Sequence, residues 1–136
     1  MLSRHELWRA VVAGALLASA CTSQGAGPVR PGGFTTFDER PCPEESLLDW
    51  DTFGHPFVLS WCTGCHSTEL PEDLRAEAPL EINLNTFEGV PAELELVWGV
   101  AADGADAMPP GGGPGVDERA LLGEWLACER DRLATD

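Results

Sequence analysis

The chain has 136 residues, and its 23 acidic side chains outnumber its 8 basic ones, all of them arginines, giving a formal net charge of −15. This excess of negative charge excludes nucleic acid as a partner and argues against non-specific binding to an anionic membrane surface. Once the N-terminal segments described next are set aside, about 100 residues remain, enough for one small domain with a thin polypeptide core.

The N-terminus has the pattern of a bacterial signal peptide. Residues 1–20 combine a basic start at Arg4 and Arg9 with an apolar run that is too short to span a bilayer. The small residues at its end fit ordinary cleavage, but residues 17–21 also resemble a lipobox, with alanine where leucine is usual. We therefore expect a lipoprotein that faces the periplasm and is anchored in a membrane through lipidated Cys21, with a soluble periplasmic protein as the alternative.

Residues 21–37 are rich in Gly, Ser, Thr and Pro, which predicts a flexible tether between the lipid and the folded part. The folded domain is then expected over residues 38–136. This stretch contains helical patterns separated by loops, with no internal repeat and no convincing alternation of apolar and polar residues. The expected fold class is therefore all-α.

A first helix is expected to begin near Asp51 or Thr52, either of which can cap it, and to run through Trp61 into the residues that follow. Those residues are Cys62-Thr63-Gly64-Cys65-His66, the Cys-x-x-Cys-His pattern of c-type haem attachment. Each thiol can form a thioether with a haem vinyl group, and His66 would then lie beneath the iron as proximal ligand. The composition predicts about 0.004 such motifs by chance, so coincidence is a weak explanation.

Two other interpretations of the motif are weaker. A thioredoxin-type redox pair lies at a strand-to-helix turn, and no alternation of strands and helices is visible here. A structural zinc site needs four ligands, with His55 or Cys42 completing the set, but the adjacent Cys65 and His66 are poorly placed to bind one tetrahedral ion. The favoured interpretation is one covalently attached haem c.

A second helix is expected over residues 86–102. A loop rich in glycine and proline follows over residues 103–115. It contains Met108, the only methionine after the signal peptide, and Pro109 favours an extended backbone at Met108. We expect this thioether to bind the sixth position of the iron, where methionine raises the reduction potential relative to a second histidine. The alternatives are a methionine that only packs on the haem edge, and His55 as the sixth ligand.

The third and clearest helix is expected over residues 116–133, because apolar side chains recur on one face at helical spacing. That face comprises Leu121, Leu122, Trp125, Leu126 and Cys128. Once one cysteine is assigned to lipid and two to haem, Cys42 and Cys128 remain. An oxidising compartment favours a disulfide between them over two buried thiols.

Several of these features together resemble a small class I cytochrome c domain. They are Gly54 before the haem motif, the motif itself, Met108-Pro109-Pro110, and the closing segment Leu121-Leu122-Gly123-Glu124-Trp125-Leu126. The stretch from Arg40 to Cys128 also resembles bacterial single-haem cytochrome c lipoproteins. The resemblance implies a cytochrome c-like fold around one haem, in which the first and last helices cross near a glycine and an aromatic residue. The chain departs from the family in having no tyrosine, so hydrogen bonds to the haem propionates must come from Trp, Arg or the backbone.

The resemblance also suggests which residues surround the haem. The family orients its proximal histidine through a proline carbonyl in the loop after the motif, and Pro79 is the candidate here, with Pro71 as the second choice. Arg75 is expected either to pair with a haem propionate or to be a solvated surface charge. Trp61 and Trp98 are expected to pack in the core.

These features predict an extracytoplasmic electron carrier rather than an enzyme, with one haem c bound by Cys62, Cys65, His66 and Met108. A haem-based sensor, or the haem subunit of a redox enzyme with a displaceable Met108, is the alternative. The acidic composition predicts a redox partner with a basic docking surface, unless the charge serves solubility alone.

Overall fold

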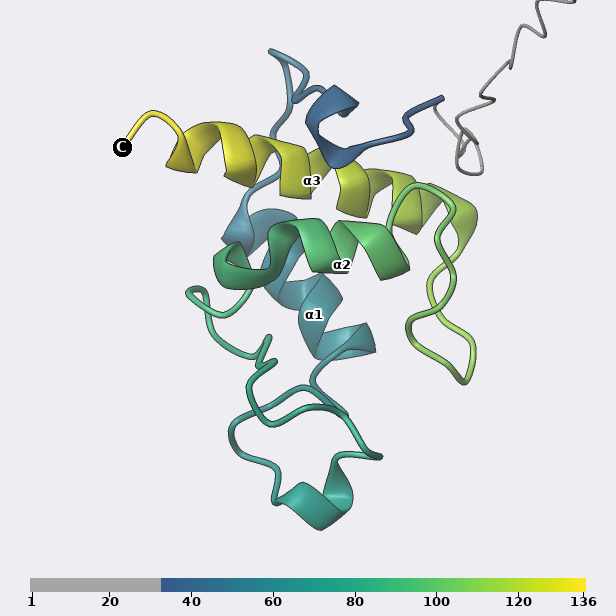
Figure 1. The fold of residues 1–136 in the computed structure, drawn as a ribbon. Coiled ribbons are helices and arrows are strands. Elements are labelled where there is room, and N and C mark those ends of the chain that lie inside the picture. Colours follow the sequence, from purple (N-terminus) through teal and green to yellow (C-terminus); the bar gives the residue numbers. More distant parts are fainter. Residues whose placement is uncertain (1–32) are drawn as a thin grey trace, which may run out of the picture.

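The computed structural model describes residues 33–136, so the expected signal peptide, Cys21 and most of the tether lie outside the described residues. Within this range the chain is helical and contains no strand, as expected for an all-α protein. The α-helices are α1 (His55–Trp61), α2 (Leu94–Ala101) and α3 (Val116–Leu133), and long loops connect them (Figure 1). Short 3-10 or π-helical turns occur at Phe37–Glu39, Trp50–Gly54, Glu72–Leu74 and Pro91–Glu93. Over residues 33–136, no helix is long and apolar enough to cross a membrane.

The longest helix, α3, has the bounds that the sequence predicts. The carboxylate of Glu118 accepts a hydrogen bond from the backbone N–H of Gly115 at 3.0 Å, which closes the first turn. Acidic residues lie in that turn and arginines in the last one, an arrangement that suits the helix dipole. Leu122, Trp125 and Leu126 are at most 1 % exposed and form the buried face. Leu121 was expected on this face, but its side chain is 42 % exposed.

The start of α2 is later than expected. The prediction placed a helix over residues 86–102, but residues 86–89 form a turn, in which the N–H of Gly89 donates to the backbone and side-chain oxygens of Thr86. Pro91 then opens a 3-10 turn, and α2 begins only at Leu94. Proline has no N–H to continue a helix from the preceding residues, so the regular hydrogen bonding starts after it. Figure 1 shows α2 alongside α3.

The cap before α1 also differs from the prediction. Asp49, rather than Asp51 or Thr52, caps the π-helical turn that leads into α1. Its carboxylate accepts from the N–H of Thr52 at 2.7 Å, and the Thr52 hydroxyl accepts from the N–H of Asp49 at 3.1 Å. The hydrogen bonds from Thr52 lower the pKa of Asp49. The helix then ends at Trp61, one residue before the Cys-x-x-Cys-His motif.

The π-helical turn Trp50–Gly54 and α1 form one continuous helical segment, here called the first helical segment. A glycine and an aromatic ring meet where this segment crosses α3. A Cβ atom on Gly54 would lie 2.2 Å from a ring carbon of Trp125, so the ring occupies the space that only glycine leaves open. Phe53 and Trp50 also contact Trp125, with ring centroids 6.1 Å and 6.2 Å away. This is the crossing that the sequence resemblance implied.

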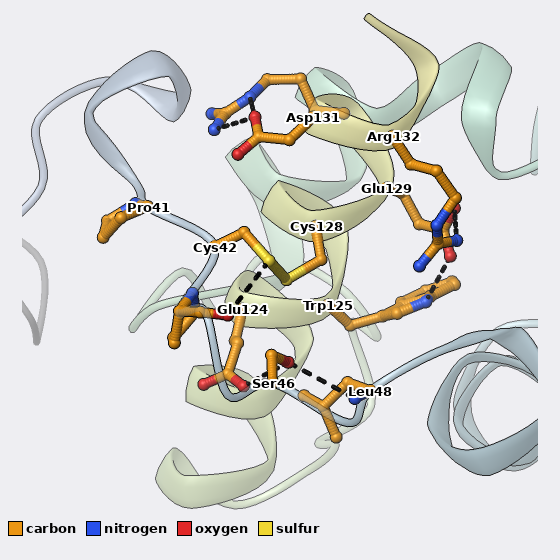
Figure 2. The surroundings of a disulfide bond; sticks show 12 residues. Pro41, Cys42, Ser46, Leu48, Glu124, Trp125, Cys128, Glu129, Asp131 and Arg132 are labelled. Carbon is orange, nitrogen blue, oxygen red and sulfur yellow. Dashed lines mark hydrogen bonds and ion pairs between the residues drawn. A yellow bond between two sulfur atoms is a disulfide. The ribbon is translucent and has the colours of Figure 1, made fainter. Parts of the chain in front are cut away.

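The segment before α1 is attached to α3 by a disulfide and by arginine. Cys42 and Cys128 form the expected disulfide, with their Cα atoms 4.7 Å apart (Figure 2). Arg130 of α3 donates to the carbonyls of Phe37 and Arg40. Because the Phe37 side chain is buried, the packed part of the chain begins before residue 38, where the domain boundary was expected.

We expect Gly54→Ala to destabilise the domain by about 1–3 kcal/mol, because the new methyl group must displace the Trp125 ring. Gly99→Ala is the matched control. A Cβ at Gly99 in α2 would meet no atom within 4 Å, and alanine is favoured over glycine inside a helix. Chemical denaturation of both variants measures the difference, and equal stability of Gly54→Ala and the wild type would contradict the crossing.

Candidate functional site

A cavity of about 280 Å³ is bordered by the end of α1, by α2, by the loop that follows the motif and by the loop between α2 and α3. The residues that line it are largely apolar: Phe57, Trp61, Cys62, Cys65, His66, Ala76, Glu77, Ala78, Pro79, Ile82, Leu84, Leu96, Val97, Val100, Ala101, Met108, Pro109, Pro110 and Pro114. Both cysteines and the histidine of the motif therefore border one space together with Met108. His55 is not among these residues, and its ring stacks on Trp50 with a centroid distance of 5.2 Å.

The two motif cysteines carry free thiols, and both are partly buried. Burial raises the pKa of the Cys62 thiol to about 12, so this thiol stays protonated near neutral pH. Such a group is unlike the low-pKa thiolate of a thioredoxin-type active site.

Zinc binding receives no support from the described part of the chain. Residues 33–136 contain no group of three or more His, Cys, Asp or Glu side chains arranged to bind a metal. Cys42, one of the residues considered as a fourth ligand, is in the disulfide with Cys128. His55, the other, stacks on Trp50.

His66 follows a tight turn in which the N–H groups of Cys65 and His66 both donate to the carbonyl of Cys62. The Nδ1 atom of His66 lies 3.3 Å from the carbonyl oxygen of Ile82. A carbonyl can only accept a hydrogen bond, so Nδ1 carries the proton in this contact and the lone pair of Nε2 remains for a metal.

Pro79 was predicted to supply the carbonyl that faces His66. In the structure that carbonyl belongs to Ile82. The Pro79 carbonyl instead accepts from the N–H of Ile82 at 3.3 Å and from Arg75 at 2.8 Å. The Pro79 carbonyl is therefore already hydrogen-bonded within the turn over residues 79–82, and the Ile82 carbonyl at the end of this turn contacts the imidazole. Pro79 still lines the cavity.

Arg75 is buried, with 3 % of its surface exposed, which rules out a solvated surface charge. Its guanidinium donates to the carbonyls of Ser67, Pro79 and Ile82 and to the side-chain oxygen of Asn83. These acceptors span the loop that follows the motif, so Arg75 fixes the shape of that loop. Its Nε is the one buried side-chain nitrogen or oxygen in the described residues that has no hydrogen-bond partner.

Met108 lies on the loop between α2 and α3, and Arg119 fixes the shape of that loop. The guanidinium of Arg119 donates to the carbonyls of Ala101, Ala105 and Met108 at 2.8, 2.6 and 2.9 Å, and to that of Pro114 at 3.1 Å. The Met108 N–H donates to the carbonyl of Val100 at 3.0 Å. The sequence analysis did not single out Arg119, although an arginine three residues before the buried Leu122 in α3 was the available signal.

The two tryptophans of interest differ in position. Trp98 is in the core, 4 % exposed, and its indole N–H donates to the buried carboxylate of Asp103 at 2.8 Å. Trp61 is only partly buried and borders the cavity.

Comparisons with protein-family models, curated proteins and solved structures found no match to this chain. The motif and the geometry around the cavity are therefore the observations that bear on function.

We expect Arg119→Met to loosen the Met108 loop, because four backbone carbonyls lose a charged donor. The free energy of unfolding should fall by about 3 kcal/mol, and Arg119→Lys should restore part of it. Hydrogen exchange gives a local measurement. The Met108 amide should exchange faster in Arg119→Met than in the wild type, while amides in the middle of α3 serve as an internal reference. Unchanged exchange at Met108 would contradict this role.

Proposed function

We propose that the protein is an extracytoplasmic electron carrier with one covalently attached haem c. Cys62 and Cys65 would hold the haem through thioethers, with His66 and Met108 as axial ligands of the iron. The observation that carries the proposal is the convergence of the motif and Met108, which are distant in sequence, on one largely apolar cavity.

The residues around the cavity fit a haem in their chemistry. Two free thiols, an imidazole with an available Nε2 and a thioether are the groups that a His/Met c-type haem requires. The aliphatic, proline and aromatic side chains of the lining suit an apolar ring system. The unpartnered Nε of Arg75 supports the expectation that this arginine pairs with a haem propionate.

Bound in this cavity, the haem iron would supply a one-electron redox couple. The residues of the chain orient and enclose it. His66 is oriented by the Ile82 carbonyl, and the backbone at Met108 is fixed by Arg119. If His66 and Met108 both bind the iron, no open site would be left for a substrate, which favours electron transfer over catalysis.

The wider fold supports a cytochrome c-like domain. Gly54 meets Trp125 at the crossing of the first helical segment with α3, and the disulfide attaches the N-terminal segment to the same helix. The fold, the lipid anchor at Cys21 and the periplasm-facing location remain parts of the proposal.

The redox partner is expected to carry a basic docking surface. Arg40, Arg75 and Arg119 are buried, so their charges are not available on the surface. Among residues 33–136 the other arginines, Arg130 and Arg132, lie in the last turn of α3. The remaining surface is acidic, and a positively charged partner would be attracted to it.

A haem-based sensor, or the haem subunit of a redox enzyme, is the second candidate. The observation that favours it is the exposure of Met108, whose surface is 39 % accessible. A ligating methionine on a partly exposed loop is easier for an external ligand to displace than one packed in the core.

Covalent attachment is tested by replacing both motif thiols. Cys62→Ser with Cys65→Ser should yield protein without covalent haem, whereas acid–acetone extraction should leave the colour on the wild type. Cys42→Ser with Cys128→Ser is the matched control, which removes the two cysteines of the disulfide and should keep the haem. If the wild-type haem is extracted, or the metal proves to be zinc, the proposal fails.

Axial ligation is tested by Met108→Ala. The ferric wild type should show the weak far-red absorption band that marks methionine ligation, and the variant should lose this band and have a lower reduction potential. His55→Ala is the control, because His55 lies outside the cavity, and it should change neither property. A loss of the band in the His55 variant alone would reverse the assignment, and its absence in the wild type would favour the sensor.

A further inference from the structure

We propose that Arg75 is a positioning residue that raises the reduction potential of the site by competing with His66 for the carbonyl of Ile82. This inference rests on the proposed haem function and deepens it. It assigns to Arg75 a role in tuning the iron through its proximal ligand, in addition to any contact with a propionate.

One carbonyl oxygen receives two donors. The Nη2 of Arg75 lies 2.8 Å from the Ile82 oxygen, and the Nδ1 of His66 lies 3.3 Å from the same atom. Typical N–H···O hydrogen bonds are about 2.9–3.0 Å long, and those with a charged donor are shorter and stronger. The guanidinium therefore makes the strong bond to this oxygen, and the imidazole makes the weak one.

The strength of the bond at Nδ1 matters for the metal. A strong acceptor draws the Nδ1 proton away from the ring and makes the imidazole a more basic ligand, which stabilises the ferric state. A carbonyl whose electron density is already polarised by Arg75 is a weaker acceptor. His66 then stays closer to a neutral imidazole, and the ferrous state gains in relative stability, so the potential rises.

The charge of Arg75 acts in the same direction. All four of its acceptors are neutral oxygens, whereas the buried Arg40 is paired with the Asp103 carboxylate at 3.1 Å. The ion pairs within residues 33–136 include none with Arg75, and Glu77, a carboxylate that lines the cavity, does not pair with it. Within residues 33–136 no carboxylate neutralises this buried cation beside His66, so the part of its charge that a haem propionate leaves unbalanced opposes the extra positive charge of oxidised iron.

Arg75 makes one of two sets of contacts that close the loop after the motif. It connects Ser67, directly after the motif, with Pro79, Ile82 and Asn83 at the end of the same loop. The N–H of Leu84 donates to the carbonyl of His66 at 3.0 Å, which closes the loop on the motif. Because this second contact does not involve the guanidinium, the Ile82 carbonyl stays beside the imidazole when Arg75 is replaced.

The test compares Arg75→Gln and Arg75→Lys with the wild type, each as the haem-loaded protein. Arg130→Gln is the matched control, because Arg130 also donates to two backbone carbonyls but in a segment, residues 37–40, that does not line the cavity. Redox titration gives the potential, and the ¹H chemical shift of the His66 Nδ1 proton in the reduced protein reports its bond to Ile82.

In Arg75→Gln, the reduced-to-oxidised ratio at a fixed solution potential should fall by about tenfold, which is about 59 mV for a one-electron couple. The Nδ1 proton should shift downfield as its hydrogen bond strengthens. Arg75→Lys retains the charge and should show a smaller fall, and Arg130→Gln should leave the potential and the Nδ1 shift near the wild-type values.

A haem-loaded Arg75→Gln with the wild-type potential and Nδ1 shift would overturn the inference while leaving the proposed function intact. If Arg75→Gln does not load haem, Arg75→Lys decides the question by the same two measurements. Failure of both variants to load haem would make the role of Arg75 purely structural and would also overturn the inference. Failure of the proposed function is distinct, because the wild type would then carry no covalent haem and no reversible one-electron couple.

Discussion

The need to satisfy backbone carbonyls in long irregular loops is the constraint on which this domain depends. Loops that border a cavity cannot leave their polar groups without partners, and there is no sheet here to supply them within the described residues. Buried arginines fill this role, because one guanidinium carries five donors. Arg75 connects the loop after the motif, Arg119 connects the Met108 loop, and Arg40 links Pro41 and Asp103 to the backbone of α3.

The sequence predicted α3 with its correct bounds because its apolar periodicity is long and its end charges agree with the helix dipole. The shorter elements were less predictable. The cap of the first helical segment lies at Asp49, and a turn at residues 86–89 with Pro91 delays the start of α2. In each case several residues were compatible with the pattern, and the local hydrogen bonds that decide between them depend on the folded neighbours.

The candidate site also contains residues that could be predicted from the sequence and residues that could not. The motif and Met108 could be found because rare residue types occur at a diagnostic spacing or beside a proline. The roles of Ile82, Arg75 and Arg119 could not, because each depends on which carbonyl a loop presents after folding. A carbonyl has no signature in the sequence, so the prediction of Pro79, with Pro71 as second choice, came from the family resemblance and not from a property of this chain. The disulfide could be predicted because Cys42 and Cys128 were the two cysteines left after the others had been assigned to lipid and haem.

The disulfide also determines which cysteines of the domain remain free thiols. Among the four cysteines of the described domain, any disulfide other than Cys42–Cys128 would use at least one of the motif thiols. The Cys42–Cys128 bond closes a ring across a sequence separation of 86 residues, and Cys62 and Cys65 lie inside it with their sulfurs still reduced. Burial raises the pKa of the Cys62 thiol, which keeps its reactive thiolate scarce. The bond that joins the two ends of the domain therefore takes neither cysteine of the motif.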